Sequence, residues 1–95
     1  MKMIKVKNME NRVGKPVVNQ FIITEISDYL KRTIFQSYNS IVATKVDDGD
    51  TYQIYLDKDT WDYSSTTGRY RNVFLGEDIH ETRKKIKNKD YLLVD

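Results

Sequence analysis

The hydrophobic pattern of the chain changes its period after residue 56, and this change limits the fold more than any other feature. Up to residue 56, apolar residues lie in short β-rich runs separated by polar turns. From residue 64 to residue 89, they follow the spacing of a helix. Strands that precede helices along the chain are typical of an α+β fold. We therefore expect a small antiparallel sheet of four or five strands with two helices packed on it.

The strands are read from runs of alternating or β-branched residues. Ile4 and Val6 alternate with lysines, which is strand period. A longer run over residues 33–46 contains Asn39 and Ser40, which indicate a bulge or bend inside one strand. An aspartate-rich turn then joins it to the next strand, so residues 33–56 are expected to form a hairpin beside residues 17–25. The expected strands cover residues 3–7, 17–25, 33–46, 51–56 and 91–94, and residues 27–32 are expected to be a connector with at most one turn of helix.

Two helices are predicted from capping residues and apolar spacing. The first begins near Ser64, buries Tyr70, Val73 and Phe74 on one face, and ends at Gly76. The second begins at Asp78, which has Glu81 at the spacing of a capping box. Its buried stripe holds Ile79 and Ile86, and lysines fill its last turns, where they suit the helix dipole.

Length and composition indicate one domain over residues 1–95 with a modest core. The absence of cysteine excludes disulfides and thiolate metal sites, and it favours a reducing cytoplasm. The N-terminus lacks the apolar run of a signal peptide, and the sequence has no stretch long enough to span a membrane. We therefore expect a cytoplasmic protein with no membrane partner.

The charge is unevenly spread along the chain. Residues 1–46 carry a net charge of +5, residues 47–62 carry −5 and residues 63–95 carry +2. A nucleic-acid binder usually has one dominant basic stripe, and here an acidic block interrupts it. Nucleic acid is therefore possible as a partner but is not favoured.

No pattern indicates catalysis, a metal or a cofactor. The single histidine, His80, is expected on the exposed flank of the second helix, without a nucleophile beside it. Asp47, Asp48 and Asp50 resemble the start of a calcium loop, but the twelfth position holds Lys58 instead of an acid. The four glycines are scattered and do not form a phosphate-binding loop. We expect a protein that binds a partner and is not an enzyme.

The densest segment of the sequence runs from residue 61 to residue 71. Trp61 is expected to anchor it in the core, and Asp62 or Ser64 to cap the first helix. Thr67 fills the first turn and Tyr70 the buried stripe, whereas Tyr63 would belong to a binding patch if the segment contacts a partner. Polar residues around Asn19 and Gln36 predict an internal network that links the sheet to the capped helix.

Three segments together resemble a family of small phage and prophage proteins from Gram-positive bacteria. They are Val-Gly-Lys-Pro-Val-Val-Asn-Gln-Phe (13–21), Phe-Gln-Ser-Tyr-Asn-Ser (35–40) and Trp-Asp-Tyr-Ser-Ser-Thr-Thr-Gly-Arg-Tyr-Arg-Asn-Val-Phe-Leu (61–75). The chain departs from that pattern at residues 26–32, where its connection is expected to be longer. The resemblance implies no catalytic residues. It implies an accessory phage protein that inhibits a host defence protein, in particular an anti-CRISPR protein acting on a Cas9-type effector.

The candidate partner-binding residues are charged or aromatic and are expected on the surface. They are Asp47, Asp48, Asp50, Tyr63, Arg69, Arg71, Lys84 and Lys87. An acidic hairpin tip can stand in for phosphates in the basic groove of a CRISPR effector, or it can simply favour the turn and keep a sheet edge soluble. Two other interpretations stay open: a nucleic-acid-binding accessory protein that uses the basic termini, and a self-associating structural or regulatory phage protein.

Overall fold

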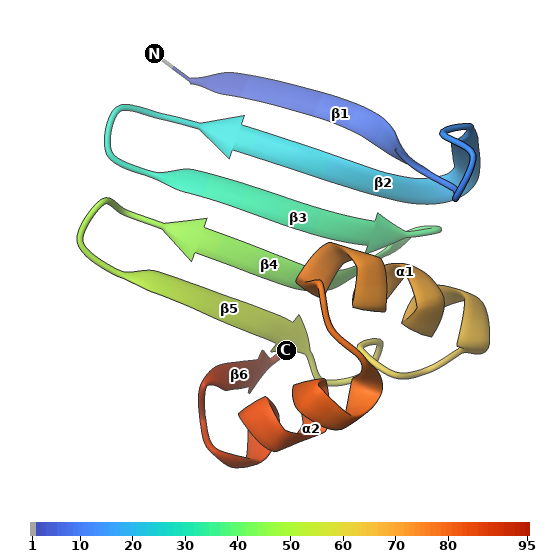
Figure 1. Cartoon of the computed structure of the whole chain (residues 1–95). Helices are drawn as coiled ribbons and strands as arrows, with labels where there is room; N and C mark the ends of the chain where they lie inside the picture. Colours follow the sequence, from blue (N-terminus) through green and yellow to red (C-terminus); the bar gives the residue numbers. More distant parts are fainter. Residues whose placement is uncertain (1) are drawn as a thin grey trace.

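A computed structural model describes residues 2–95, and it forms one six-stranded sheet with two helices against one face (Figure 1). Met1, which begins the domain expected over residues 1–95, lies outside the described residues. The elements in chain order are β1 (Met3–Glu10), β2 (Pro16–Ile26), β3 (Lys31–Ser37), β4 (Ser40–Asp47), β5 (Tyr52–Asp57), α1 (Ser65–Leu75), α2 (Ile79–Lys87) and β6 (Tyr91–Val94).

The strands lie in the sheet in the order in which they occur in the chain, from β1 at one edge to β6 at the other. The pairs from β1 to β5 are all antiparallel, because short turns connect them. β6 pairs with β5 in parallel, because the two helices between these strands return the chain to the end where β5 began. The predicted α+β class with two helices is confirmed, whereas the purely antiparallel pairing is wrong at this last strand.

The sheet has six strands instead of four or five, because the strand expected over residues 33–46 is two strands. The chain reverses at Tyr38 and Asn39, where Tyr38 adopts a left-handed φ of 55°. The expected bulge lies further on, at Val42. Phe35 pairs with Ala43 and Gln36 pairs with Ile41, so Val42 is the extra residue on its strand.

The connector expected over residues 27–32 is a tight hairpin turn. The backbone N–H of Ser27 donates to the carbonyl of Leu30 at 2.9 Å, and β3 already begins at Lys31. The turn therefore contains no helix, and it is shorter than the expected connector because only residues 27–30 lie between the strands. The two strands that it joins pair without a break from Ile26 to Gln20.

The core lies between the helices and one face of the sheet. Phe35 and Phe74 pack with their ring centroids 5.8 Å apart, and Val42, Ala43 and Leu56 are almost completely buried beside them. Residues directly opposite each other on paired strands share a face, and Phe35, Ala43 and Leu56 form one such row. Their row therefore defines the covered face of the sheet.

The helix boundaries follow the predicted caps. The Ser64 side chain accepts a hydrogen bond from the backbone N–H of Thr67, and Gly76 ends α1 with a left-handed φ of 71°. Asp78 caps α2 by accepting from the backbone N–H of Glu81. The predicted stripe of α1 is wrong at Val73, which is exposed, because Phe74 faces the sheet and Val73 precedes it on the outer side of the helix.

Replacing the cap of α1 tests how much its first turn depends on one side chain. We expect Ser64→Ala to lower the free energy of unfolding by about 1 kcal/mol, because the backbone N–H of Thr67 loses its acceptor. Urea denaturation followed by circular dichroism measures the change. Ser65→Ala is the matched control, and this exposed residue should change stability by less than about 0.5 kcal/mol. Equal effects of the two variants would contradict the role assigned to Ser64.

Candidate functional site

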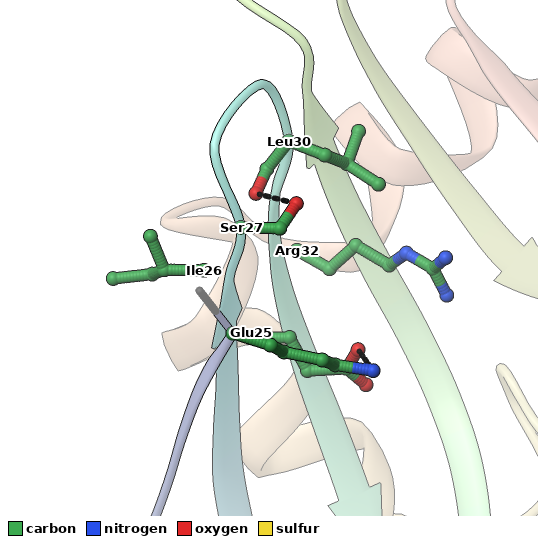
Figure 2. Close-up of a pocket in the computed structure, with 6 residues that line it drawn as sticks. Glu25, Ile26, Ser27, Leu30 and Arg32 are labelled. Atoms are coloured by element: carbon green, nitrogen blue, oxygen red, sulfur yellow. Dashed lines mark hydrogen bonds and ion pairs between the residues drawn. The ribbon is translucent and has the colours of Figure 1, made fainter.

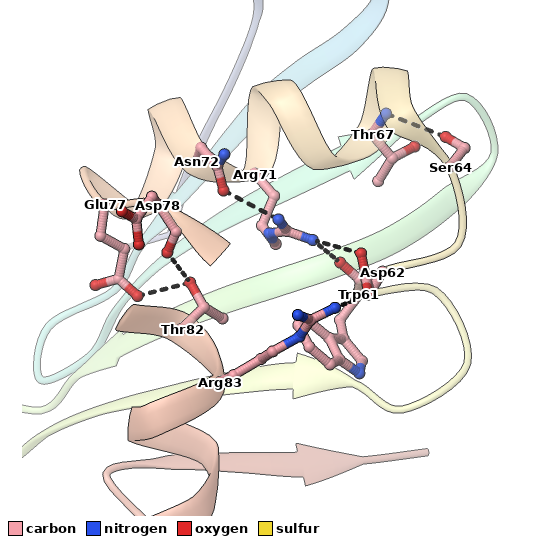
Figure 3. A network of polar contacts seen from close by, with 10 residues as sticks. All are labelled: Trp61, Asp62, Ser64, Thr67, Arg71, Asn72, Glu77, Asp78, Thr82 and Arg83. Carbon is pink, nitrogen blue, oxygen red and sulfur yellow. Dashed lines mark hydrogen bonds and ion pairs between the residues drawn. The ribbon is translucent and has the colours of Figure 1, made fainter. Parts of the chain in front are cut away.

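The joint between β5 and α1 is held by Arg71, which is 1% exposed (Figure 3). One terminal nitrogen of its guanidinium, Nη1, donates to the backbone carbonyl of Trp61 at 2.7 Å and contacts Asp62 Oδ1 at 3.3 Å. The other, Nη2, donates to the side chain of Asn72 at 3.0 Å. The guanidinium also lies 5.5 Å from the ring of Trp61, within the range of a cation–π contact. Arg71 was predicted as a partner-binding residue, and its burial excludes it from the surface.

A second buried charge, Glu77, joins the two helices to β6. Its carboxylate accepts hydrogen bonds from Lys85 Nζ at 2.7 Å, Thr82 Oγ1 at 2.7 Å and the Tyr91 hydroxyl at 2.8 Å. Burial disfavours the charged form of Glu77, but these donors outweigh burial and hold its pKa below the ordinary value. Burial, together with the hydrogen bond to Glu77, raises the pKa of Tyr91 to about 12. Sequence patterns did not predict this cluster, because Tyr91 lies 14 residues from Glu77 along the chain and meets it only in the folded structure.

The predicted polar network between sheet and helix exists, but hydroxyl groups form it. The Ser37 and Thr67 hydroxyls hydrogen-bond each other at 2.8 Å, and both residues are fully buried. Gln36 lies on the opposite face of the sheet, where its amide donates to the carbonyl of Tyr38. Asn19 instead contacts the β3–β4 turn, where its backbone carbonyl accepts from the N–H of Tyr38. The expectation that Gln36 and Asn19 link the sheet to the helix is therefore wrong.

The acidic residues at the tip of the β4–β5 hairpin build the turn. Asp48 accepts hydrogen bonds from the backbone N–H groups of Asp50 and Thr51 and from the Thr51 hydroxyl, while Asp47 accepts from Gly49. The backbone hydrogen bonds from Thr51 and Asp50 lower the pKa of Asp48. The carboxylates of Asp47 and Asp48 therefore stabilise the turn, and this role does not require a partner.

The predicted surface residues do not form one site. The turn of Asp47, Asp48 and Asp50 lies at the end of the sheet away from α1 (Figure 1). Tyr63 is exposed in the segment before α1, and Arg69 is exposed on α1, where it borders a pocket of about 390 Å³ with Arg12 and Val13. Lys84 and Lys87 are exposed on α2.

The face of the sheet opposite the helices, which we call the open face, is rich in apolar residues. One row across all six strands holds Val6, Ile23, Ile34, Thr44, Tyr55 and Leu92. The flanking rows add Ile4, Phe21, Ile41 and Val46. Ile41 is 50% exposed and Val6 is 62% exposed, although both are large and apolar. The alternation of β1 indicated that Ile4 and Val6 share a face, but it gave no sign that this face would have no cover.

The open face carries charge near the β2–β3 turn, at Glu25 and Arg32, and at the other end of the strands, at Asp57 on β5. Glu25 and Arg32 lie opposite each other on the paired strands, and Glu25 forms an ion pair with Lys2 at 3.6 Å. Figure 2 shows Glu25 and Arg32 pointing away from Ile26, which belongs to the other face. The pocket that these residues line has a volume of only about 100 Å³, too small for most ligands.

A second uncovered surface lies on the helix side of the sheet, beyond the reach of the helices. It is a shallow groove of about 650 Å³ over β1, β2 and the start of β3. Its floor holds Ile22, Thr24 and Ile26, and three lysines border it: Lys5, Lys7 and Lys31. We call this surface the lysine groove.

The chain matches a model of a family of unknown function, DUF8033, over residues 4–91. It belongs to this family. No curated protein and no solved structure is significantly similar to it. Within residues 2–95, no helix of this DUF8033 chain is long and apolar enough to cross a membrane.

Removing the buried guanidinium tests the joint between β5 and α1. We expect Arg71→Met to lower the free energy of unfolding by about 2 kcal/mol, because the Trp61 carbonyl and the Asn72 side chain lose a charged donor. Arg69→Met is the matched control on the same helix, and this exposed residue should change stability by less than about 0.5 kcal/mol. Equal stabilities of the two variants in urea would contradict the anchoring role of Arg71.

The Glu77 cluster predicts loss of stability in acid. A lowered pKa in the folded state means that Glu77 contributes stability above its ordinary pKa of 4.5. That contribution is lost as the pH falls through the lower pKa that Glu77 has in the folded state. Glu77→Gln should therefore destabilise the protein more at pH 7 than at pH 3, as measured by urea denaturation at both values. Glu81→Gln is the control, because it removes one exposed carboxylate from the same region. A destabilisation by Glu77→Gln that is the same at pH 7 and pH 3 would contradict the role of Glu77.

Proposed function

We propose that this protein is a non-enzymatic binding protein that docks a partner protein against its open face. The observation that carries the proposal is a row of side chains, apolar except for Thr44, that crosses all six strands and that no element within residues 2–95 covers. Monomeric proteins rarely leave a contiguous apolar surface of this kind exposed, and such surfaces commonly mark interaction sites. A flat sheet face offers a broad contact area and no enclosed cavity.

The ionisable groups that join the helices to the sheet support binding over catalysis, because their hydrogen bonds are made within the chain. Glu77, Lys85 and Tyr91 satisfy one another between α2 and β6. Lys45 donates to the backbone carbonyl of Phe74 at 2.7 Å and lies over the ring of that residue, so it ties α1 to the sheet. A catalytic acid or base needs its proton-carrying atom directed at a bound substrate. The atoms of these groups are directed at other parts of the same chain.

The class of partner follows from the resemblance of residues 13–21, 35–40 and 61–75 to small phage and prophage proteins. We propose that the partner is a host defence protein, in particular a Cas9-type CRISPR effector, and that binding inhibits it in the bacterial cytoplasm. An inhibitor of this kind needs an accessible surface and no chemistry of its own. The open face meets that requirement.

Nucleic acid is the second candidate partner, and the lysine groove is the observation that favours it. Lys5, Lys7 and Lys31 lie on the same side of three adjacent strands, where they would attract phosphates. Self-association through the open face is the third possibility, since two such faces can pack as a sandwich.

A charge placed on the open face tests the proposal. Ile41→Lys should fold normally, because Ile41 is 50% exposed, and should weaken partner binding by about 30-fold or more. Val73→Lys is the matched control, because Val73 is a similarly exposed apolar residue on the helix side. Binding to purified Cas9-type effectors is measured by biolayer interferometry, with DNA cleavage as the functional assay.

Three outcomes separate the candidates. No binding to any effector, together with unimpaired cleavage, would remove the defence-protein partner. A salt-dependent gel shift with DNA or RNA would favour nucleic acid. A dimer in light scattering that Ile41→Lys converts to a monomer would show that the open face serves self-association.

A further inference from the structure

The outer edge of β1 is an uncovered strand edge. β1 lies at the end of the strand order and pairs only with β2. It is eight residues long, and within residues 2–95 no other segment forms backbone hydrogen bonds along its outer side. Such an edge presents a row of free backbone donors and acceptors, which another strand can pair with. β1 contains no proline, and its only irregularity is near Met9 at one end.

The two faces of this edge differ in chemistry. On the helix side, Lys5 and Lys7 border the lysine groove, and neither makes an ion pair within the described chain. On the open face, the neighbouring positions hold Ile4 and Val6. Successive side chains of a strand added to β1 would lie alternately beside the lysines on one face and beside Ile4 and Val6 on the other.

We infer that the outer edge of β1 binds an extended segment of the partner protein as an added strand, with acidic residues alternating with apolar ones. The acidic residues lie beside Lys5 and Lys7, and the apolar residues extend the open face past Ile4 and Val6. Backbone hydrogen bonds hold the segment, and the alternating side chains select it. This inference rests on the proposed function, because it names the part of a protein partner that the DUF8033 chain recognises.

Charge disfavours a second copy of this chain as the occupant. Two β1 strands can pair in an antiparallel manner with their covered faces on the same side. In that arrangement Lys5 or Lys7 of one copy lies opposite Lys5 or Lys7 of the other. If one copy is inverted, lysines lie opposite apolar residues such as Val6 instead. An acidic strand avoids both mismatches.

The chemistry of the edge also favours a peptide over nucleic acid. A single strand of DNA or RNA combines phosphate contacts with stacking of bases on aromatic side chains. None of the residues that line the lysine groove is aromatic. Nucleic acid would also leave the apolar side of β1 at Ile4 and Val6 without a contact. A peptide strand uses both sides and the backbone between them.

The test uses synthetic peptides and the full chain. The probe is a fluorescein-labelled eight-residue peptide that alternates glutamate and valine, and its counterpart carries lysine in place of each glutamate. We expect the acidic peptide to bind the wild-type protein and the basic peptide to bind at least tenfold more weakly, as measured by fluorescence anisotropy. In the double variant Lys5→Glu/Lys7→Glu this preference should reverse. The variant should fold normally, because both side chains are exposed, and circular dichroism checks this.

Two controls separate the edge from other basic surfaces. The double variant Lys84→Glu/Lys87→Glu removes the same number of exposed lysines from α2 and should bind the acidic peptide as the wild type does. NMR amide shifts caused by the peptide should concentrate in residues 3–10. A reversal of preference together with shifts in β1 supports the inference. Absence of binding, an unchanged preference in Lys5→Glu/Lys7→Glu, or shifts concentrated in α2 would overturn it.

The same assay distinguishes failure of this inference from failure of the proposed function. Ile41→Lys lies on β4, three strands away from β1, and should leave peptide binding unchanged while it weakens binding of the whole partner. If the partner binds through the open face but Lys5→Glu/Lys7→Glu has no effect, only the edge-strand inference fails. If an oligothymidine probe displaces the acidic peptide from β1, the edge binds nucleic acid and the inference is overturned.

Discussion

The structure depends on a mismatch between the size of the sheet and the amount of helix available to cover it. Five gaps between six strands span about 24 Å across the sheet, whereas the 11 residues of α1 make a helix about 16 Å long and α2 has only nine. Both helices lie on one face and near one end of the strands (Figure 1). The opposite face and the β1 side of the covered face therefore remain uncovered, and every candidate binding surface follows from this arrangement.

A core of limited size explains why charged groups anchor the helices. Lys45 binds the end of α1, Arg71 binds the segment before it, and Glu77 joins α2 to β6. Each of these side chains is largely buried, and a buried charge is tolerated only when hydrogen bonds replace its water. Arg71, which looks functional in the sequence, is one of these buried anchors, and Asp48 stabilises the β4–β5 turn. The surfaces left for a partner consist of ordinary apolar residues and lysines.

The two uncovered surfaces meet along β1. Its apolar side chains continue the open face, and its lysines border the groove on the other side. A partner segment at this edge would join a contact with the sheet face to one with the backbone, and it would protect an edge that otherwise favours aggregation. The lysines already limit pairing between copies of the chain, and the same charge can select an acidic partner.

Local signals in the sequence determined the fold class, the two helices, their caps at Ser64 and Asp78, and the acidic turn, because each depends on neighbouring residues. The reversal at Tyr38 was predicted only as a bulge or bend at Asn39 and Ser40, since tyrosine seldom adopts a positive φ. Only the tertiary structure decided that Arg71 is buried while Arg69 is exposed, that Glu77 meets Tyr91, and which face of the sheet lacks a cover. These outcomes depend on where the helices dock, and docking is set by contacts between residues far apart in the chain. Strand alternation shows that two faces differ, but a sequence pattern of period two is the same whichever face the helices cover.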